Sequence, residues 1–262
     1  MNKTHFDNAV SFGRELIRTG DLDPVYFALR ALPLQQRFRT ALAYFCLYHL
    51  GAAGYLGRFK GSEFWDYLDI AAANKNLTWP RGAERRHWRG AAAVDCAAWL
   101  RKNYSEPEQV IYSWYNGASS KRFSSIAEQV KKTPAYGPWI SFKVADVMER
   151  CLDLAVDFSD CNLGIYREPR AGAALLLTGD AETPITDAQL TEVFAALGKA
   201  IGKLKAPPHH DRCVNLQELE TVCCKYKSHV NGHYPVGKDL KEVAHALSDS
   251  RWGTKRMLEA LP

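Results

Sequence analysis

The chain has 262 residues, a formal net charge of +5, 47% hydrophobic residues and 24% charged residues. This composition is typical of a globular protein and excludes an intrinsically disordered one. The longest apolar runs, residues 71–73 and 173–177, are too short to span a bilayer, and the amino-terminal segment is polar and amphipathic rather than a signal peptide. The seven cysteines are odd in number and widely spaced, so we expect reduced thiols in a soluble, cytoplasmic protein with no membrane partner.

Apolar residues recur with the helical period along most of the chain, and few segments alternate with the period of two that strands require. The first half is expected to form helices over residues 6–17, 24–29, 34–50, 62–70, 83–102, 107–115 and 119–131. The glycine-rich segment 51–61, between the third and the fourth of these helices, is expected to form a turn.

The second half is expected to contain a long helix from Pro138, followed by helices over residues 170–179, 187–205, 215–227, 238–247 and 254–261. Pro207 and Pro208 mark the only candidate domain boundary, but the part that follows them is small for an independent core. We therefore predict an all-α, compact multi-helix fold. We expect one helical domain over residues 1–262, with residues 207–262 as a C-terminal helical extension that packs on the rest of the domain.

Basic and aromatic residues alternate in the segment WPRGAERRHWRG, residues 79–90. Its arginines are Arg81, Arg85, Arg86 and Arg89. Arginines interleaved with aromatic rings suit a phosphate backbone with stacked bases, so these four residues are candidate nucleic-acid contacts. The alternative is a solvated helix face whose two tryptophans anchor it in the core.

Metal and nucleophile motifs are weak in this sequence. Cys213, Cys223, Cys224, His229 and His233 lie in one segment, but the adjacent cysteines point in different directions on a helix and no pair has the usual zinc-site spacing. We therefore expect no metal and no cofactor. The sequence also lacks the serine-elbow and phosphate-loop patterns, which disfavours serine hydrolases, nucleotide kinases and dinucleotide enzymes.

The turn from Tyr136 to Trp139 carries the clearest sign of a site. Gly137 allows close approach of a ligand, and Pro138 suits the first helical position, so the free amides of this helix start are suited to hold a phosphate. Lys143, Asp146 and Arg150 follow at spacings of three and four and share one face of the helix. They form either a catalytic strip or an exposed face with ordinary ion pairs.

A second polar set lies near the C-terminus, in the segment LETVCCKYKSHVNGHYPVGKD. It contains Glu220, Lys227 and Asp239, and Glu220 shares a helix face with Cys224. The alternative for this set is a helix end with lysines placed well for the helix dipole, followed by a tight turn.

Two blocks of the sequence resemble a known family. The segment YGPWISFKVADVMERCLDLAVDFSD resembles the glycine-proline-aromatic helix of the α-glutamyl/putrescinyl thymine pyrophosphorylases of phages and bacteria, and it is similar to the helical domain found with 5-hydroxymethyluracil DNA kinases. The second block resembles the same family at Glu220, Cys223, Lys227, Gly232, Tyr234, Gly237 and Asp239. The likeness extends from Tyr44 to Asp239 in the order of the elements.

The resemblance implies a fold like that of the helix-hairpin-helix DNA glycosylases and an activity in bacteriophage DNA hypermodification, within a bacterial host cell. The family enzyme displaces pyrophosphate from pyrophosphorylated 5-hydroxymethyluracil in DNA with an amine or an amino acid. The sequence has no Pro-Gly-Ile-Gly hairpin loop, so Gly137 and Pro138 would have to take its place. A non-catalytic helical DNA-binding protein and a base-excision glycosylase remain alternatives, and the oligomeric state stays open.

The expected chemistry assigns roles to the residues above. Departing pyrophosphate needs positive charge or amides, and the attacking amine needs a carboxylate to hold or deprotonate it. The candidate catalytic residues are Lys143, Asp146 and Glu220. The candidate substrate-binding residues are Gly137, Trp139, Arg150, Lys227, Asp239, Tyr55 and Arg58. A base that is modified inside a duplex must be flipped out, and Tyr55, Trp65 or Trp139 would stack on it.

Overall fold

The computed structural model describes residues 1–74 and 78–262. Throughout these residues the regular elements are helices, and β-type pairing is confined to isolated bridges between Arg122 and Asp157 and between Lys205 and Cys213. The predicted all-α class is therefore confirmed, whereas the likeness to helix-hairpin-helix glycosylases stays a prediction. Among the described residues, no helix combines the length and the apolar character that crossing a membrane requires.

The chain divides into two compact units, and each unit combines segments from both ends of the sequence. The first unit contains Met1–Pro24, Cys161–Glu242 and the terminal Pro262, and the second contains Val25–Asp160 and Val243–Leu261. Residues of the expected extension 207–262 thus contribute to both units. The single-domain organisation stays a prediction.

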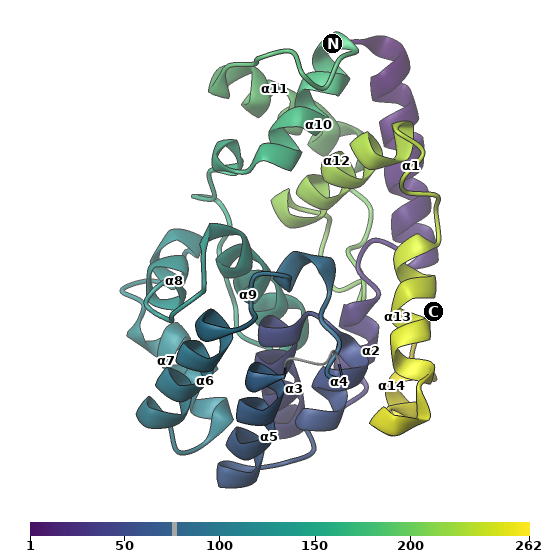
Figure 1. Cartoon of the computed structure of the whole chain (residues 1–262). Coiled ribbons are helices and arrows are strands. Elements are labelled where there is room, and N and C mark those ends of the chain that lie inside the picture. The colour runs from purple at the N-terminus through teal and green to yellow at the C-terminus, as the bar shows by residue number, and fades with distance from the viewer. Residues whose placement is uncertain (75–77) are drawn as a thin grey trace. The chain divides into compact units, whose positions relative to one another are not determined.

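Four helices make up most of the first unit: α1 (Lys3–Thr19), α10 (Arg167–Thr178), α11 (Asp187–Ile201) and α12 (Leu216–Val230). α1 packs against the other three, as can be followed in Figure 1. The short 3-10 helix η2 (Leu163–Ile165) precedes α10, and α13 (Lys238–Ser248) begins in this unit. α1 is followed by its C-cap Gly20, whose left-handed backbone (φ 72°) is easily adopted only by glycine and ends the helix there.

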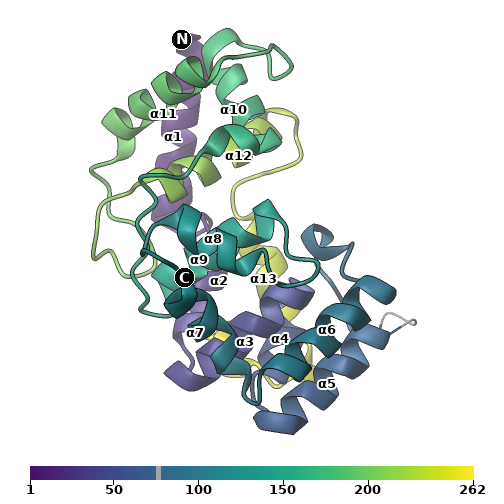
Figure 2. The same ribbon diagram turned by 90° about the vertical axis from the view of Figure 1, so that its left-hand side faces the viewer.

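The second unit is built around α3 (Leu34–Leu47), which packs against α2 (Val25–Arg30), α4 (Leu50–Leu56), α7 (Pro107–Gly117) and α9 (Pro138–Cys151). Every residue from Phe38 to Leu47 is buried, so α3 has no solvent-facing side over that length. The other helices of this unit are α5 (Gly61–Ala73), η1 (Ala83–Arg85), α6 (Ala91–Asn103), α8 (Phe123–Val130), η3 (Ser250–Trp252) and α14 (Lys255–Leu258). α5 and α6 lie side by side, as Figure 2 shows.

The glycine-rich segment that was predicted to form a turn is instead largely helical, because α4 covers residues 50–56. Gly51 lies against Ala246 and Gly57 lies against Thr40, so closely that a Cβ atom at either glycine would clash. The glycines therefore permit close packing of backbone against backbone rather than a change of direction. The prediction was wrong because glycine promotes both arrangements, and only the neighbouring elements distinguish them.

The helix predicted over residues 83–102 is also different in the structure. It is divided into η1 and α6, which are separated by Gly90 with a left-handed backbone (φ 58°). Two further predicted helices are shorter than expected, since α8 begins at Phe123 and α11 ends at Ile201.

Candidate active site

The amino-terminal end of α9 is open, as the sequence predicted. Gly137 occupies the N-cap position in an extended conformation, no side chain caps the helix, and the first turn carries no acidic residue. Apart from its two neighbours in the chain, no described residue places an atom within 4 Å of the position where a Cβ atom of residue 137 would lie. Trp139 is 39% exposed, and its ring meets that of Tyr48 edge-on at 5.1 Å. An anion therefore has free access to an uncapped helix start beside an exposed aromatic ring.

Two turns further along α9, three polar side chains form a buried cluster. The Nζ atom of Lys143 lies 3.0 Å from Oδ2 of Asp146, and the hydroxyl of Tyr26 from α2 donates to the same oxygen. Lys143 also lies over the Tyr26 ring, 5.2 Å from its centre. The side chains of Lys143 and Asp146 are only 11% and 3% exposed. The alternative of an exposed face with ordinary ion pairs is therefore wrong for these two residues, because their charges are withdrawn from solvent.

Arg150 lies on the same helix but far from its start. Thirteen residues separate it from Gly137, which corresponds to about 20 Å along a helix. Its side chain is 1% exposed and lies 3.3 Å from the carboxylate of Glu149. A small anion held by the amides after Gly137 therefore cannot contact Arg150 as well, and a substrate-binding role for Arg150 stays a prediction.

Each of the polar residues predicted in the first unit has a partner of its own. Lys227 forms an ion pair with Glu168, whereas Asp239 forms one with Lys225 at 2.6 Å. Glu220 accepts a hydrogen bond from the thiol of Cys224 at 3.2 Å, which confirms that these two side chains share a helix face. Burial, with a further contribution from Glu220, raises the pKa of Cys224 well above its usual range, so this thiol stays protonated at neutral pH.

Asp21 organises the segment that carries the second family-like block, whereas the sequence indicated it only as a candidate cap for the helix that follows. Its side chain is fully buried, and its carboxylate accepts hydrogen bonds from the hydroxyl of Tyr234 (3.1 Å) and from the amides of Gly237 (2.7 Å) and Leu240 (2.8 Å). Lys225 adds bonds to the carbonyl oxygen of Asp21 (2.7 Å) and to the Tyr234 hydroxyl (2.8 Å). Tyr234 and Gly237 thus hold the chain after α12 onto the end of α1.

Tyr55 and Arg58 lie at an aromatic cluster of the second unit. The Tyr55 ring contacts the rings of Phe59, Tyr67, Trp79 and Trp252. The exposed Arg58 guanidinium stacks over Tyr55, 4.8 Å from the ring centre. Trp65, the other aromatic candidate of this region, is 2% exposed and donates its indole N–H to Ser105, so it is unsuited to stack on a base without rearrangement.

The four arginines of residues 79–90 differ in their surroundings. Arg86 and Arg89 are exposed, and Arg81 is partly buried and stacks on Trp88 at 5.5 Å. Arg85 is buried, donates to the carbonyl oxygen of Ala135 at 2.9 Å and lies over the Tyr136 ring. Arg85 therefore braces the turn before α9, and its burial is at odds with the predicted phosphate contact at this position.

Replacing Arg86 and Arg89 by alanine is expected to weaken DNA binding and to lower the slope of log K against log salt by at most about 1.8, since each phosphate contact contributes about 0.9. Fluorescence anisotropy at several salt concentrations measures this slope. The exposed lysines Lys199 and Lys203 provide a control with the same change in net charge, and their replacement should leave the slope unchanged. An unaltered slope for the arginine variant would remove residues 79–90 from the DNA-binding surface.

Several residues of the candidate site carry no signal in the sequence. Tyr26 precedes Asp146 by 120 positions, and Tyr48 meets Trp139 only because α3 packs against α9. Helical periodicity identifies which residues share a face, but it does not identify the helix that covers that face.

The sequence matches the family model described as amino acid:DNA transferase over residues 12–234. It is 38% identical over 259 residues to a glycinyltransferase of Pseudomonas phage PaMx11, with 90% of this chain and 88% of that protein aligned. It is 28% identical over 249 residues to a putrescinyltransferase of Delftia phage PhiW-14, with 91% of this chain and 77% of that protein aligned.

Proposed function

Because the chain belongs to the amino acid:DNA transferase family, we propose that it couples an amino acid to pyrophosphorylated 5-hydroxymethyluracil in DNA and releases pyrophosphate. The enzyme acts in phage-type DNA hypermodification, and its substrates are DNA and an amine or amino acid. The family match over residues 12–234 carries this conclusion, and the sequence resemblance to transferases of this kind is thereby confirmed.

The proposed reaction requires one bond to form and one to break at the methylene carbon of the base. The amine nitrogen attacks this carbon, the bond from carbon to the pyrophosphate oxygen breaks, and a proton leaves the nitrogen. The leaving group gains negative charge in the transition state, so positive groups placed near it accelerate its departure. The open start of α9 and the ammonium group of Lys143 are the candidates in the second unit for this task.

Asp146 is the candidate for holding or deprotonating the incoming amine. In the structure its carboxylate is bonded to Lys143 and Tyr26. A bound pyrophosphate would compete with Asp146 for the Lys143 ammonium, because both are anions. Release of Lys143 would remove one of the donors to Oδ2 of Asp146, so that the amine can donate a hydrogen bond in its place. Trp139, which is exposed beside the same helix start, is the candidate for stacking on the flipped base.

Glu220, Lys227 and Asp239 remain candidates of the first unit, each with a partner within that unit. The identity of the transferred group rests on similarity. The glycinyltransferase shares 38% of aligned residues and the putrescinyltransferase 28%, which favours an amino acid over a diamine.

Nucleoside mass spectrometry tests the proposed function. Duplex DNA that contains 5-hydroxymethyluracil, with and without prior pyrophosphorylation by a DNA kinase, is incubated with the protein and glycine. We expect a nucleoside with glycine attached through its amino group, together with one pyrophosphate per adduct, and only in pyrophosphorylated DNA. Unchanged nucleosides would support a binding protein, and release of a free base would support a glycosylase. Either result would overturn the proposal.

A further inference from the structure

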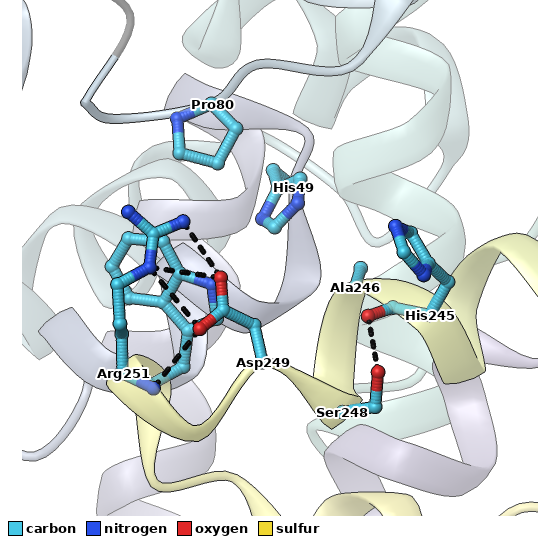
Figure 3. A pocket seen from close by; sticks show the side chains of 8 residues that line it. His49, Pro80, His245, Ala246, Ser248, Asp249 and Arg251 are labelled. Carbon is cyan, nitrogen blue, oxygen red and sulfur yellow. Dashed lines mark hydrogen bonds and ion pairs between the residues drawn. The ribbon is translucent and has the colours of Figure 1, made fainter.

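A pocket of the second unit is lined in part by the link between α3 and α4, to which His49 belongs. Its volume is about 360 Å³, and it is lined by His49, Pro80, His245, Ala246, Ser248, Asp249, Arg251 and Trp252 (Figure 3). His49 follows directly on Tyr48, the residue whose ring contacts Trp139. His49, which lines the pocket, and Tyr48, which contacts Trp139 beside α9, are therefore neighbours in the chain.

His49 presents a neutral hydrogen-bond donor to this pocket. Its Nδ1 atom accepts from the backbone amide of Ala52 at 3.2 Å, because His49 is the N-cap of α4. Burial lowers the pKa of His49 to about 4, so the ring is neutral at pH 7. In a neutral ring whose Nδ1 accepts, the proton lies on Nε2. No group in residues 1–74 or 78–262 accepts a hydrogen bond from it.

Trp252 supplies a second donor without an acceptor. Its side chain is 5% exposed, and its indole N–H has no hydrogen-bond partner among the described residues. A buried N–H group without a partner destabilises a protein unless water or a ligand satisfies it. Trp252 lines the pocket, so a ligand that reaches the edge of its indole ring would supply the missing acceptor.

The lining residues of the pocket include one carboxylate and one guanidinium, which form an ion pair. Asp249 is its only acidic group among the described lining residues, and the Arg251 guanidinium holds it by bonds of 2.6 to 3.1 Å, which Figure 3 shows as dashed lines. Arg251 also stacks on Trp252 at 4.9 Å, and its remaining nitrogen, Nη1, forms no bond to the described residues. Because Asp249 and Arg251 neutralise each other, the polar groups left for a ligand are N–H donors: Nη1 of Arg251 and the ring N–H groups of His49 and Trp252.

On the basis of the proposed function, we propose that this pocket binds the carboxylate of the incoming amino acid through the N–H groups of His49 and Trp252 and the guanidinium of Arg251. Two neutral donors and one cation match the two oxygens of a carboxylate. A diamine such as putrescine would instead bring a second ammonium group to an arginine. The pocket is thus a determinant of which group the enzyme transfers.

Steady-state transfer kinetics with Trp252→Phe and Arg251→Gln test this site. Phenylalanine keeps the aromatic ring and removes only the N–H donor. We expect the KM for glycine to rise about tenfold in each variant, as is typical for the loss of a hydrogen bond to a charged group, while kcat and DNA affinity stay unchanged. Glycinamide, which lacks the carboxylate, should be a poor substrate for the wild type, and the variants should use it equally poorly. Arg256→Gln, an exposed arginine of α14 outside the pocket, is the matched control and should behave as the wild type.

A KM for glycine within twofold of the wild type in both variants would overturn the site. Weaker DNA binding with an unchanged KM for glycine would overturn it as well, in favour of a phosphate contact. Equilibrium dialysis of labelled glycine against the free protein separates this inference from the proposed function. If the wild type transfers no amine at all, the proposed function fails. The carboxylate site then stands if glycine binds and the variants weaken its binding, and it falls if they do not.

Discussion

Asp146→Asn is expected to reduce the rate of amine transfer by about a hundred- to ten-thousand-fold, the usual contribution of a positioned base. The amide retains the shape of the carboxylate but can neither accept the proton nor attract the amine. Transfer of glycine to pyrophosphorylated DNA measures the rate, and a DNA-binding titration should give wild-type affinity. A wild-type rate in this variant would remove Asp146 from the mechanism.

The stability of the Asp146→Asn variant has to be measured together with its transfer rate. Asp146 is the partner of Lys143 in a pair that is nearly withdrawn from solvent, and removal of one partner of a buried pair costs about 3–5 kcal/mol of stability. The double variant Lys143→Gln/Asp146→Asn removes both charges and should recover much of this loss. If either residue of the pair acts in chemistry, the double variant is stable and inactive. If the pair is only structural, the double variant regains activity together with stability.

Asp153→Asn is the matched control for the loss of an acidic residue near the same helix. Asp153 lies just beyond α9, its side chain is 58% exposed, and it pairs with Arg30 and Arg37. Arg30 and Arg37 are only 23% and 11% exposed, but both also donate to the carbonyl oxygen of Cys151, so neither loses its only acceptor in this variant. We therefore expect a small loss of stability, on the order of 1 kcal/mol, and a wild-type transfer rate.

Asp21→Ala is expected to destabilise the first unit by about 3–5 kcal/mol, because removal of this carboxylate leaves several buried donors without an acceptor. The donors are the Tyr234 hydroxyl and the amides of Gly237 and Leu240. Urea denaturation gives the change in the free energy of unfolding, and hydrogen exchange at the two amides shows whether the loss is local.

Asp7→Ala provides the control for this second variant, because Asp7 is an exposed residue of α1 and should change stability by no more than about 0.5 kcal/mol. Slow, wild-type exchange at Gly237 and Leu240 in Asp21→Ala would show that other contacts hold this segment. The assignment of Tyr234 and Gly237 to a structural role would then be wrong.

Helix positions were predictable wherever local chemistry sets them. The end of α1 at Gly20 and the start of α9 at Pro138 follow from the backbone preferences of glycine and proline, which act within a few residues. The glycines of α4 were wrongly predicted to form a turn. A residue without a Cβ atom permits both a turn and a close contact between backbones, so the sequence does not distinguish the two. Gly51 adopts the second role only because Ala246, far along the chain, packs against it.

The candidate site was predictable in its residue types but not in its surroundings. The spacing of Lys143 and Asp146 placed them on one helix face, and the structure joins them at 3.0 Å. Whether that face is exposed or buried depends on α2, which supplies Tyr26, and no local pattern connects the two helices. The same limit applies to Arg85, which belongs to a basic segment but lies in the interior.

The sequence by itself determined the all-α class, most helix starts and ends, the family and the open start of α9, because each of these depends on the period of the helix or on short motifs. Only the tertiary structure decided which polar groups are buried, which ion pairs form and where the pocket around His49 lies. The physical reason is that burial and electrostatic pairing arise between segments far apart in the chain. For example, Lys225 donates a hydrogen bond to Asp21, which precedes it by 204 positions.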